Sequence, residues 1–289
     1  MIELNQCANP WLGLAPYSVS QSDLFFGRDR DISDICVNIE ENTSTVIYGV
    51  SGSGKTSIIN AGLIPRLSEA HYLPFTLRLQ HDSSVSYGRQ IIDACERALS
   101  KVGAESECLT DSSQSLSDND RLWLYFHTSR FWSSSNHRVI PVMFIDQFEE
   151  LFTLSDGEEQ VVSFFELIRV LFSDVAPECV IRSMEDDKGT SILCNINLGL
   201  RLVISIREDF LARLEDYSGD IPLLRRNRIG LKPLNGLQAM EVITKPSPGI
   251  VSREAALKII SRVSGMTDIS EDRLASITID SSILSLFCS

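Results

Sequence analysis

The chain has 289 residues, 43 % of them hydrophobic, which is enough apolar material for one large domain or for a core with a smaller appendage. Its formal net charge of −13 excludes a protein that binds nucleic acid directly over a broad basic surface, so any polyanion must be bound locally. No apolar run reaches the roughly 18 residues of a membrane span, no signal-peptide pattern opens the sequence, and the seven cysteines include no Cys-x-x-Cys pair, so we expect a soluble cytoplasmic protein.

Apolar runs alternate with segments of helical spacing along most of the chain. The predicted strands are residues 44–50, 73–80, 139–146, 201–207 and 228–234. The predicted helices among them are residues 55–67, 86–99, 120–132, 158–172 and 208–216. Strands that alternate with helices of this length form crossover units, so the sequence predicts an α/β fold with a parallel sheet covered on both faces.

Other stretches depart from this alternation. Residues 103–120 and 182–191 are rich in Ser, Asp and Glu without periodicity, which predicts mobile surface loops. Strand signals stop after about residue 235, and three helical patterns predict a small helical appendage at 237–245, 253–265 and 281–288. The last pattern ends on the apolar ILSLFCS, and an apolar helix face needs a partner, so we expect a fragment of a longer protein.

Residues 49–57, GVSGSGKTS, follow the first predicted strand and fit the phosphate-loop pattern G-x-x-x-x-G-K-[ST]. In such a loop, backbone N–H groups surround phosphate oxygens and the next helix presents its positive end to the same anion. Lys55 would reach the β and γ phosphates of a nucleotide, and the Thr56 hydroxyl would bind Mg²⁺. A flexible Gly/Ser loop is the alternative, disfavoured by the strand before and the helix after. The predicted nucleotide-binding residues of this loop are Gly49, Ser51, Gly52, Ser53, Gly54, Lys55, Thr56 and Ser57.

A carboxylate ends the third predicted strand, in the stretch VMFIDQFEELF. Asp146 follows four apolar residues, where a hard oxygen ligand for Mg²⁺ is needed beside the phosphate loop. Glu149 and Glu150 come three and four residues later, near enough to polarise an attacking water, and either could be the catalytic base. The alternative is that these acids only complement the dipole at a helix start.

Arg207 ends the fourth predicted strand in VISIREDFLARL. A guanidinium at this strand end could bind the γ-phosphate, because arginine recognises planar anions through two parallel hydrogen bonds. A structural ion pair is the competing interpretation, with Glu208, Asp209 or the acids at 149 and 150 as the partner.

Five segments together resemble the novel STAND NTPase family of signal-transduction ATPases: 10–32 with FFGRDRDI, 49–67 with the phosphate loop, 144–154 with FIDQFEELF, 204–214 and 228–246. The likeness is collinear from about residue 10 to residue 246. It implies a P-loop NTPase three-layer sandwich over residues 1–234, with a five-stranded parallel sheet in the order 5-1-4-3-2. It also implies that residues 235–289 are the start of a helical lid, cut short.

The resemblance implies roles for individual residues. Gly27 and Arg28 would help form an adenine pocket, Asp146 and Thr56 would hold Mg²⁺, and Arg207 would be the sensor arginine. Relatives usually carry a proline in the lid where this chain has Ser281 or Ser282, which puts closure of the lid over the base in question.

The function implied by the resemblance is a regulatory switch that binds ATP and Mg²⁺ and hydrolyses ATP slowly. ADP would hold a closed monomer and ATP an open, self-associating form, with effector and sensor domains supplied by further segments or proteins. Bacterial antiviral defence or programmed cell death is the expected setting. The alternatives are a constitutive AAA-type remodelling ATPase, for which no aromatic pore loop stands out, and a small-molecule kinase, which would need an acceptor pocket with its own base.

Overall fold

The computed structural model describes residues 9–81, 84–107, 116–183, 198–219, 221–246, 248–266 and 269–289. Residues 108–115 of the first predicted surface loop and 184–191 of the second lie outside these ranges. In the part of the chain that is described, no helix combines the length and apolarity needed to cross a membrane.

The main sheet has five strands, all parallel, in the order β2-β5-β6-β1-β7. Numbered in chain order and read from β7, these strands follow the order 5-1-4-3-2, which confirms the predicted architecture and topology. The strands are β1 (Ser44–Gly49), β2 (Tyr72–Leu77), β5 (Ile140–Ile145), β6 (Arg201–Arg207) and β7 (Arg228–Gly230).

The register of the sheet determines which residues meet at its edge. Tyr72 pairs with Ile140 and Leu77 with Ile145 along β2 and β5, and Ile145 pairs with Ile204 of β6. Strands β5 and β6 are almost entirely buried, as their near-continuous apolar sequences predict. Because parallel strands share one carboxyl edge, the residues that follow β2, β5 and β6 come together there.

The chain divides into two compact units, residues 38–46 with 67–228 and residues 1–37 with 47–66 and 229–289. The first of these, unit A, holds β2, β5 and β6. Its other elements are α4 (Tyr87–Val102), β3 (Glu105–Glu107), α5 (Asp118–Thr128), β4 (Arg130–Trp132), α6 (Glu150–Thr153), α7 (Glu158–Leu171), α8 (Glu178–Ser183), η4 (Glu208–Phe210), α10 (Leu211–Tyr217) and η5 (Pro222–Leu224).

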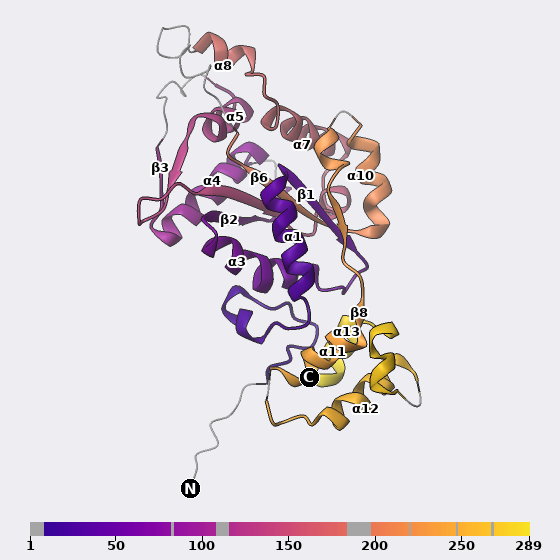
Figure 1. The fold of residues 1–289 in the computed structure, drawn as a ribbon. Coiled ribbons are helices and arrows are strands. Elements are labelled where there is room, and N and C mark those ends of the chain that lie inside the picture. The colour runs from indigo at the N-terminus through magenta and orange to yellow at the C-terminus, as the bar shows by residue number, and fades with distance from the viewer. Residues whose placement is uncertain are drawn as a thin grey trace. The chain divides into compact units, whose positions relative to one another are not determined.

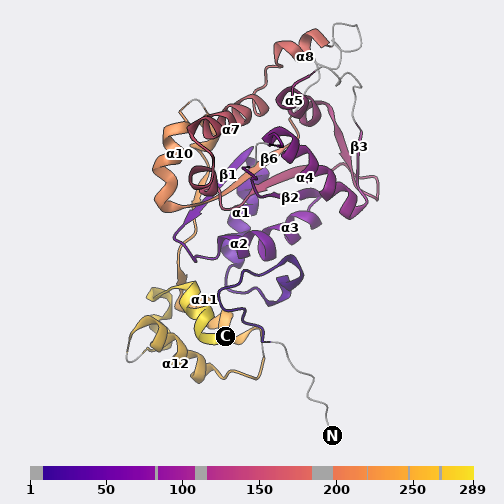
Figure 2. The ribbon, with the colours of Figure 1, turned by 180° about the vertical axis from the view of Figure 1, so that it is seen from behind.

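Within unit A, α4 lies alongside β2 and packs against α5 and α7 (Figure 2). Strands β3 and β4 pair antiparallel, and both correct the sequence-based predictions. Residues 105–107 were predicted as part of a loop, and residues 130–132 were predicted as the end of a helix. The helix α5 ends because Ser129 takes an extended conformation, and the residues after it alternate, with Phe131 buried between exposed Arg130 and half-buried Trp132. An aromatic, alternating segment favours a strand once a partner strand is available.

The second unit, unit B, holds the N-terminal segment, the residues after β1 and the C-terminal helices. Its elements are η1 (Val19–Leu24), most of α1 (Asp29–Glu41), α2 (Lys55–Ser57), the π-helical η2 (Ile58–Leu63), the start of α3 (Ile64–Glu69), β8 (Leu234–Asn235), α11 (Gly236–Thr244), α12 (Arg253–Ser264), η6 (Glu271–Ser276), β9 (Thr278–Ile279) and α13 (Ser281–Cys288).

Residues after 233 form a hydrophobic cluster of their own in unit B. Ala239 and Ile243 of α11 pack with Ala256 and Ile260 of α12, and the cluster takes in Leu284 of α13. The three helices gather around the C-terminus (Figure 1). The predicted helices at 237–245, 253–265 and 281–288 are therefore present, and the antiparallel pair β8–β9, which the sequence did not indicate, ties the two ends of this segment together.

Candidate functional site

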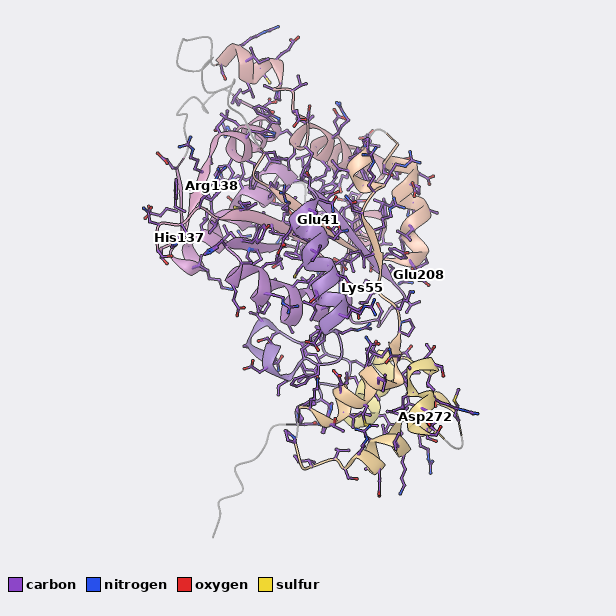
Figure 3. All side chains as sticks on the ribbon, in the orientation of Figure 1. Glu41, Lys55, His137, Arg138, Glu208 and Asp272 are labelled. Carbon is purple, nitrogen blue, oxygen red and sulfur yellow. The ribbon has the colours of Figure 1, made fainter. Side chains whose placement is uncertain are left out.

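The phosphate-loop motif connects β1 to α2 in unit B. Gly52 and Gly54 have φ of 75° and 91°, a left-handed conformation that favours glycine. A Cβ on Gly49 would lie 2.8 Å from the carbonyl oxygen of Leu231, so this position also excludes a side chain. The glycines of the motif are thus required by the path of the loop, and Lys55 opens the helix that follows (Figure 3).

Lys55 and Ser53 supply the polar groups inside the loop. Lys55 is only 9 % exposed, and its Nζ donates to the carbonyl oxygens of Gly49 and Val50, each at 3.0 Å. The buried Ser53 hydroxyl has no hydrogen-bond partner among the described residues. A buried hydroxyl without a partner is costly unless a ligand binds it, so the loop fits a phosphate group. Ser57, by contrast, accepts a hydrogen bond from the Tyr17 backbone N–H at 3.2 Å.

Arg28 connects the N-terminal segment to this loop, whereas Gly27 lies against α11, where a Cβ would come within 2.7 Å of the Gln238 carbonyl oxygen. The guanidinium of Arg28, 4 % exposed, donates to the Ser53 carbonyl at 3.1 Å, the Lys232 carbonyl at 2.8 Å and the Asp31 carboxylate at 3.0 Å. Burial lowers the pKa of Arg28, and the hydrogen bond to Asp31 opposes that shift. Arg28 therefore stabilises the backbone of the phosphate loop through its hydrogen bond to the Ser53 carbonyl.

The first turn of α13 lies against the phosphate loop within unit B. Ser281 Oγ donates to the Gly52 carbonyl at 2.9 Å, and a Cβ on Gly52 would approach Ser282 Oγ to 3.0 Å. Asp280 caps the helix by accepting from the backbone N–H groups of Ser282 and Ile283. Ser281 and Ser282 at the start of α13 thus lie against the phosphate loop.

Asp146 follows β5 in unit A and is held by a buried serine on the neighbouring strand. Ser205 Oγ donates to Asp146 Oδ1 at 2.7 Å, and Ser205 is fully buried. Gln147 has φ of 55°, an unusual conformation for a residue other than glycine, so the chain turns sharply directly after Asp146. Ser205 is not among the predicted site residues, although a single hydroxyl in the apolar strand RLVISIR was a signal for it.

Phe148 anchors this turn. It is fully buried, and its ring lies 5.8 Å from Phe152, 5.7 Å from Phe164 and 6.0 Å from Phe165, measured between centroids. Its backbone N–H donates to the Ser205 carbonyl at 2.9 Å. The acids on both sides of Phe148 are therefore fixed in direction by a packed aromatic cluster.

Glu149 and Arg207 meet at the carboxyl edge of β5 and β6. Glu149 Oε2 accepts from the Arg207 backbone N–H at 3.2 Å. The Arg207 guanidinium turns away to Asp209, with Nε–Oδ1 at 3.0 Å and Nη2–Oδ2 at 2.6 Å, and this hydrogen bonding raises the pKa of Arg207. Of the partners that the sequence left open, Asp209 forms the ion pair, while the adjacent Glu208 (Figure 3) begins η4.

Glu150 points to the other neighbouring strand. Arg78, just after β2, makes two hydrogen bonds to the Glu150 carboxylate. Its Nη2–H donates to Oε1 at 2.8 Å and its Nε–H donates to Oε2 at 3.2 Å. Hydrogen bonding to Glu150 raises the pKa of Arg78. Arg78 is not among the predicted site residues, because the contact depends on β2 lying beside β5 in the sheet.

A metal ion beside Asp146 would be coordinated by few protein side chains. Among the residues that the structure describes, no three His, Cys, Asp or Glu side chains are grouped to hold a metal ion. Magnesium commonly binds through one or two protein oxygens together with substrate phosphates and water. The Asp146 carboxylate, held by Ser205, is an oxygen ligand of the type that Mg²⁺ prefers, so this residue fits magnesium.

Ser205→Ala tests whether Asp146 depends on the serine hydroxyl. Because a hydrogen-bonded partner orients a metal-binding carboxylate, we expect this variant to bind Mg²⁺ about tenfold more weakly, with a stability loss of about 1 kcal/mol. The measurement is a Mg²⁺ binding titration beside a thermal melt. Ser44→Ala is the control, since Ser44 is a buried hydroxyl of unit A that donates to the Leu223 carbonyl. An equal Mg²⁺ shift in both variants would contradict the role of Ser205.

Comparison with solved structures gives many similar folds at low sequence identity. A Walker-type ATPase of Pyrococcus abyssi has a TM-score of 0.48 and 15% identity, over 95% of this chain and 69% of that one. Cdc6p of Pyrobaculum aerophilum has a TM-score of 0.49 and 13% identity, over 90% of this chain and 59% of that one. No curated protein sequence matches the chain.

The family is shown by the sequence itself. The model of the family described as Novel STAND NTPase 1 matches residues 10–257, which include the phosphate loop, Asp146, both glutamates and Arg207. The match also extends through α11 into α12. The chain therefore has a P-loop NTPase fold and belongs to the Novel STAND NTPase 1 family.

Proposed function

We propose that this protein is a regulatory switch that binds ATP with Mg²⁺ and hydrolyses ATP slowly. The observation that carries the proposal is the phosphate loop, with its buried Lys55 ammonium and the unpartnered Ser53 hydroxyl, in a chain of the STAND family. A loop of this composition and conformation binds the β and γ phosphates of a nucleotide.

The proposed roles follow the chemistry of phosphoryl transfer. Lys55 and the loop N–H groups bind the phosphates, Thr56 and Asp146 hold Mg²⁺, and the acid pair after Asp146 provides the base for water. Bound Mg²⁺ would supply charge neutralisation at the phosphates. Gly27 and Arg28 support the adenine side of the site, a role that rests on the family resemblance.

Arg207 gives the switch a means to distinguish ATP from ADP. In the structure its guanidinium makes two parallel hydrogen bonds to Asp209. Two oxygens of a γ-phosphate can accept the same pair of parallel hydrogen bonds, so a γ-phosphate competes with Asp209 for the guanidinium. If the Arg207 guanidinium leaves Asp209 for the γ-phosphate, η4 loses an ion pair. The presence of the third phosphate thereby changes the contacts of the segment that begins at η4, as in other nucleotide switches.

The first turn of α13 provides a second response element. Its Ser281 hydroxyl is bonded to the Gly52 carbonyl of the phosphate loop. A nucleotide that reshapes the loop changes this contact, and we propose that ADP favours the closed form and ATP an open form that self-associates. The effector and sensor partners would respond to that change, and antiviral defence or programmed cell death in bacteria is the setting we propose.

The proposal is tested by denaturing the purified protein, identifying released nucleotide by chromatography, and measuring steady-state turnover. Retained ADP near one per chain with turnover well below 1 s⁻¹ is the expected result, since typical enzymes turn over at about 10 s⁻¹. Fast multiple turnover without retained nucleotide would favour the AAA-type remodelling ATPase. Transfer of phosphate to a small molecule, seen by product screening, would favour a kinase.

A further inference from the structure

The two glutamates after β5 point to different strands of unit A. The Glu149 carboxylate accepts from the backbone N–H of Arg207 at the end of β6. The Glu150 carboxylate accepts from the guanidinium of Arg78, just beyond the end of β2. In the sheet β6 neighbours β1, the strand that leads into the phosphate loop, whereas β2 is an edge strand.

The two carboxylates also differ in the groups that donate hydrogen bonds to them. Both oxygens of Glu150 accept hydrogen bonds from the Arg78 guanidinium, a bidentate pair that fixes the direction of the carboxylate and occupies one acceptor site on each oxygen. Glu149 receives one hydrogen bond from a neutral backbone N–H on Oε2. Such a bond orients the carboxylate without neutralising it, which is what a general base needs.

We propose that Arg78 is a positioning residue that holds Glu150 away from the attacking water and leaves Glu149 as the base. The inference rests on the proposed function and deepens it. In the hydrolysis step, the water oxygen bonds to the γ-phosphorus and the bond from phosphorus to the bridging oxygen breaks, its electron pair leaving with ADP. Glu149 takes the proton that the water loses, and the inorganic phosphate carries the former γ-phosphoryl group.

The ion pair is suited to positioning because it adds little to folding stability. The Arg78 side chain is 75 % exposed and that of Glu150 is 20 % exposed, and pairs with so exposed a partner contribute little. Removing Arg78 therefore leaves the protein folded, and its effect on hydrolysis reports on the acids themselves.

Single-turnover hydrolysis with protein in excess over labelled ATP tests the assignment. Glu149→Gln should lower the rate about a hundredfold or more while ATP stays bound, as the loss of a general base does. Glu150→Gln should stay within about tenfold of the unmodified protein. Adding Arg78→Ala to Glu149→Gln frees Glu150, one residue away, and should recover about tenfold of the lost rate.

Two controls separate charge from geometry. Arg78→Lys lacks the two-pronged guanidinium but keeps a positive charge that can still form a charge-assisted hydrogen bond with Glu150, so in the Glu149→Gln background it should give no recovery. Arg169→Ala removes a bidentate arginine–glutamate pair of the same kind from the exposed surface of α7 and should change nothing. Recovery with Arg169→Ala would contradict the proposal, as would greater loss of rate in Glu150→Gln than in Glu149→Gln.

A second measurement does not depend on hydrolysis. Labelling with a carboxyl-reactive reagent, read by mass spectrometry, should modify Glu150 several-fold more in Arg78→Ala than in the unmodified protein or in Arg78→Lys. If the protein binds ATP but never hydrolyses it, the proposed function fails while this labelling still supports or contradicts the pairing. Equal Glu150 labelling in all three proteins would overturn the positioning role of Arg78.

Discussion

Lys55→Ala should abolish retention of nucleotide and weaken ATP and ADP binding about a hundredfold. The Lys55 ammonium is buried in the phosphate loop and is bonded to the Gly49 and Val50 carbonyls. A charge-assisted hydrogen bond contributes about 1.5–3 kcal/mol, and about 1.4 kcal/mol corresponds to a factor of ten in affinity. Loss of the Lys55 contacts to the β and γ phosphates is thus sufficient to weaken binding about a hundredfold. Calorimetry or filter binding measures the affinity for ATP and ADP.

The matched control for Lys55→Ala is Lys101→Ala, because Lys101 lies exposed in the last turn of α4. That variant should retain nucleotide like the unmodified protein. Thermal melts of both variants show whether lost binding follows from lost folding. Unchanged ADP affinity in a folded Lys55→Ala protein would mean that the loop does not bind phosphate.

Asp146→Asn should lower ATP hydrolysis about a hundredfold or more while ADP still binds. An amide oxygen can still accept the hydrogen bond from Ser205, so the turn around Phe148 keeps its anchor. The lost negative charge removes the protein carboxylate proposed for Mg²⁺, which holds the phosphates in the reacting arrangement. Hydrolysis should also lose its dependence on Mg²⁺ concentration in the millimolar range.

The control for Asp146→Asn is Asp93→Asn, which removes a carboxylate that is paired with Arg89 on the surface of α4. Hydrolysis should be unaffected in that protein. The measurement is a Mg²⁺ titration of single-turnover hydrolysis, with ADP affinity measured in parallel. A fully Mg²⁺-dependent rate in Asp146→Asn would show that another group holds the metal.

Some features of the protein could be predicted because they depend on short stretches of sequence. Strands β5 and β6 of the main sheet are near-continuous apolar runs, since a central parallel strand is buried on both faces. The phosphate loop requires glycine at fixed places because only glycine takes those backbone angles without cost. The carboxylate at 146 was located by its place directly after a buried strand.

Other features could not be predicted because they join residues far apart in the chain. Strand β4 was expected to be part of a helix, since the pairing with β3 that favours a strand is not encoded within the segment. The helices α11, α12 and α13 were found by their periodicity, but the strand pair β8–β9 joins residues 234–235 to residues 278–279. Such pairings depend on the fold as a whole.

The sequence by itself determined the fold class, the strand order through its family likeness, the phosphate loop and the positions of the acids. Only the tertiary structure decided how the polar groups are paired: Ser205 with Asp146, Arg207 with Asp209, and Arg78 with Glu150. The physical reason is that an ion pair or hydrogen bond between strands depends on strand neighbourhood and register. Two adjacent glutamates that are alike in sequence thereby acquire different surroundings, one beside a neutral N–H and the other beside a guanidinium.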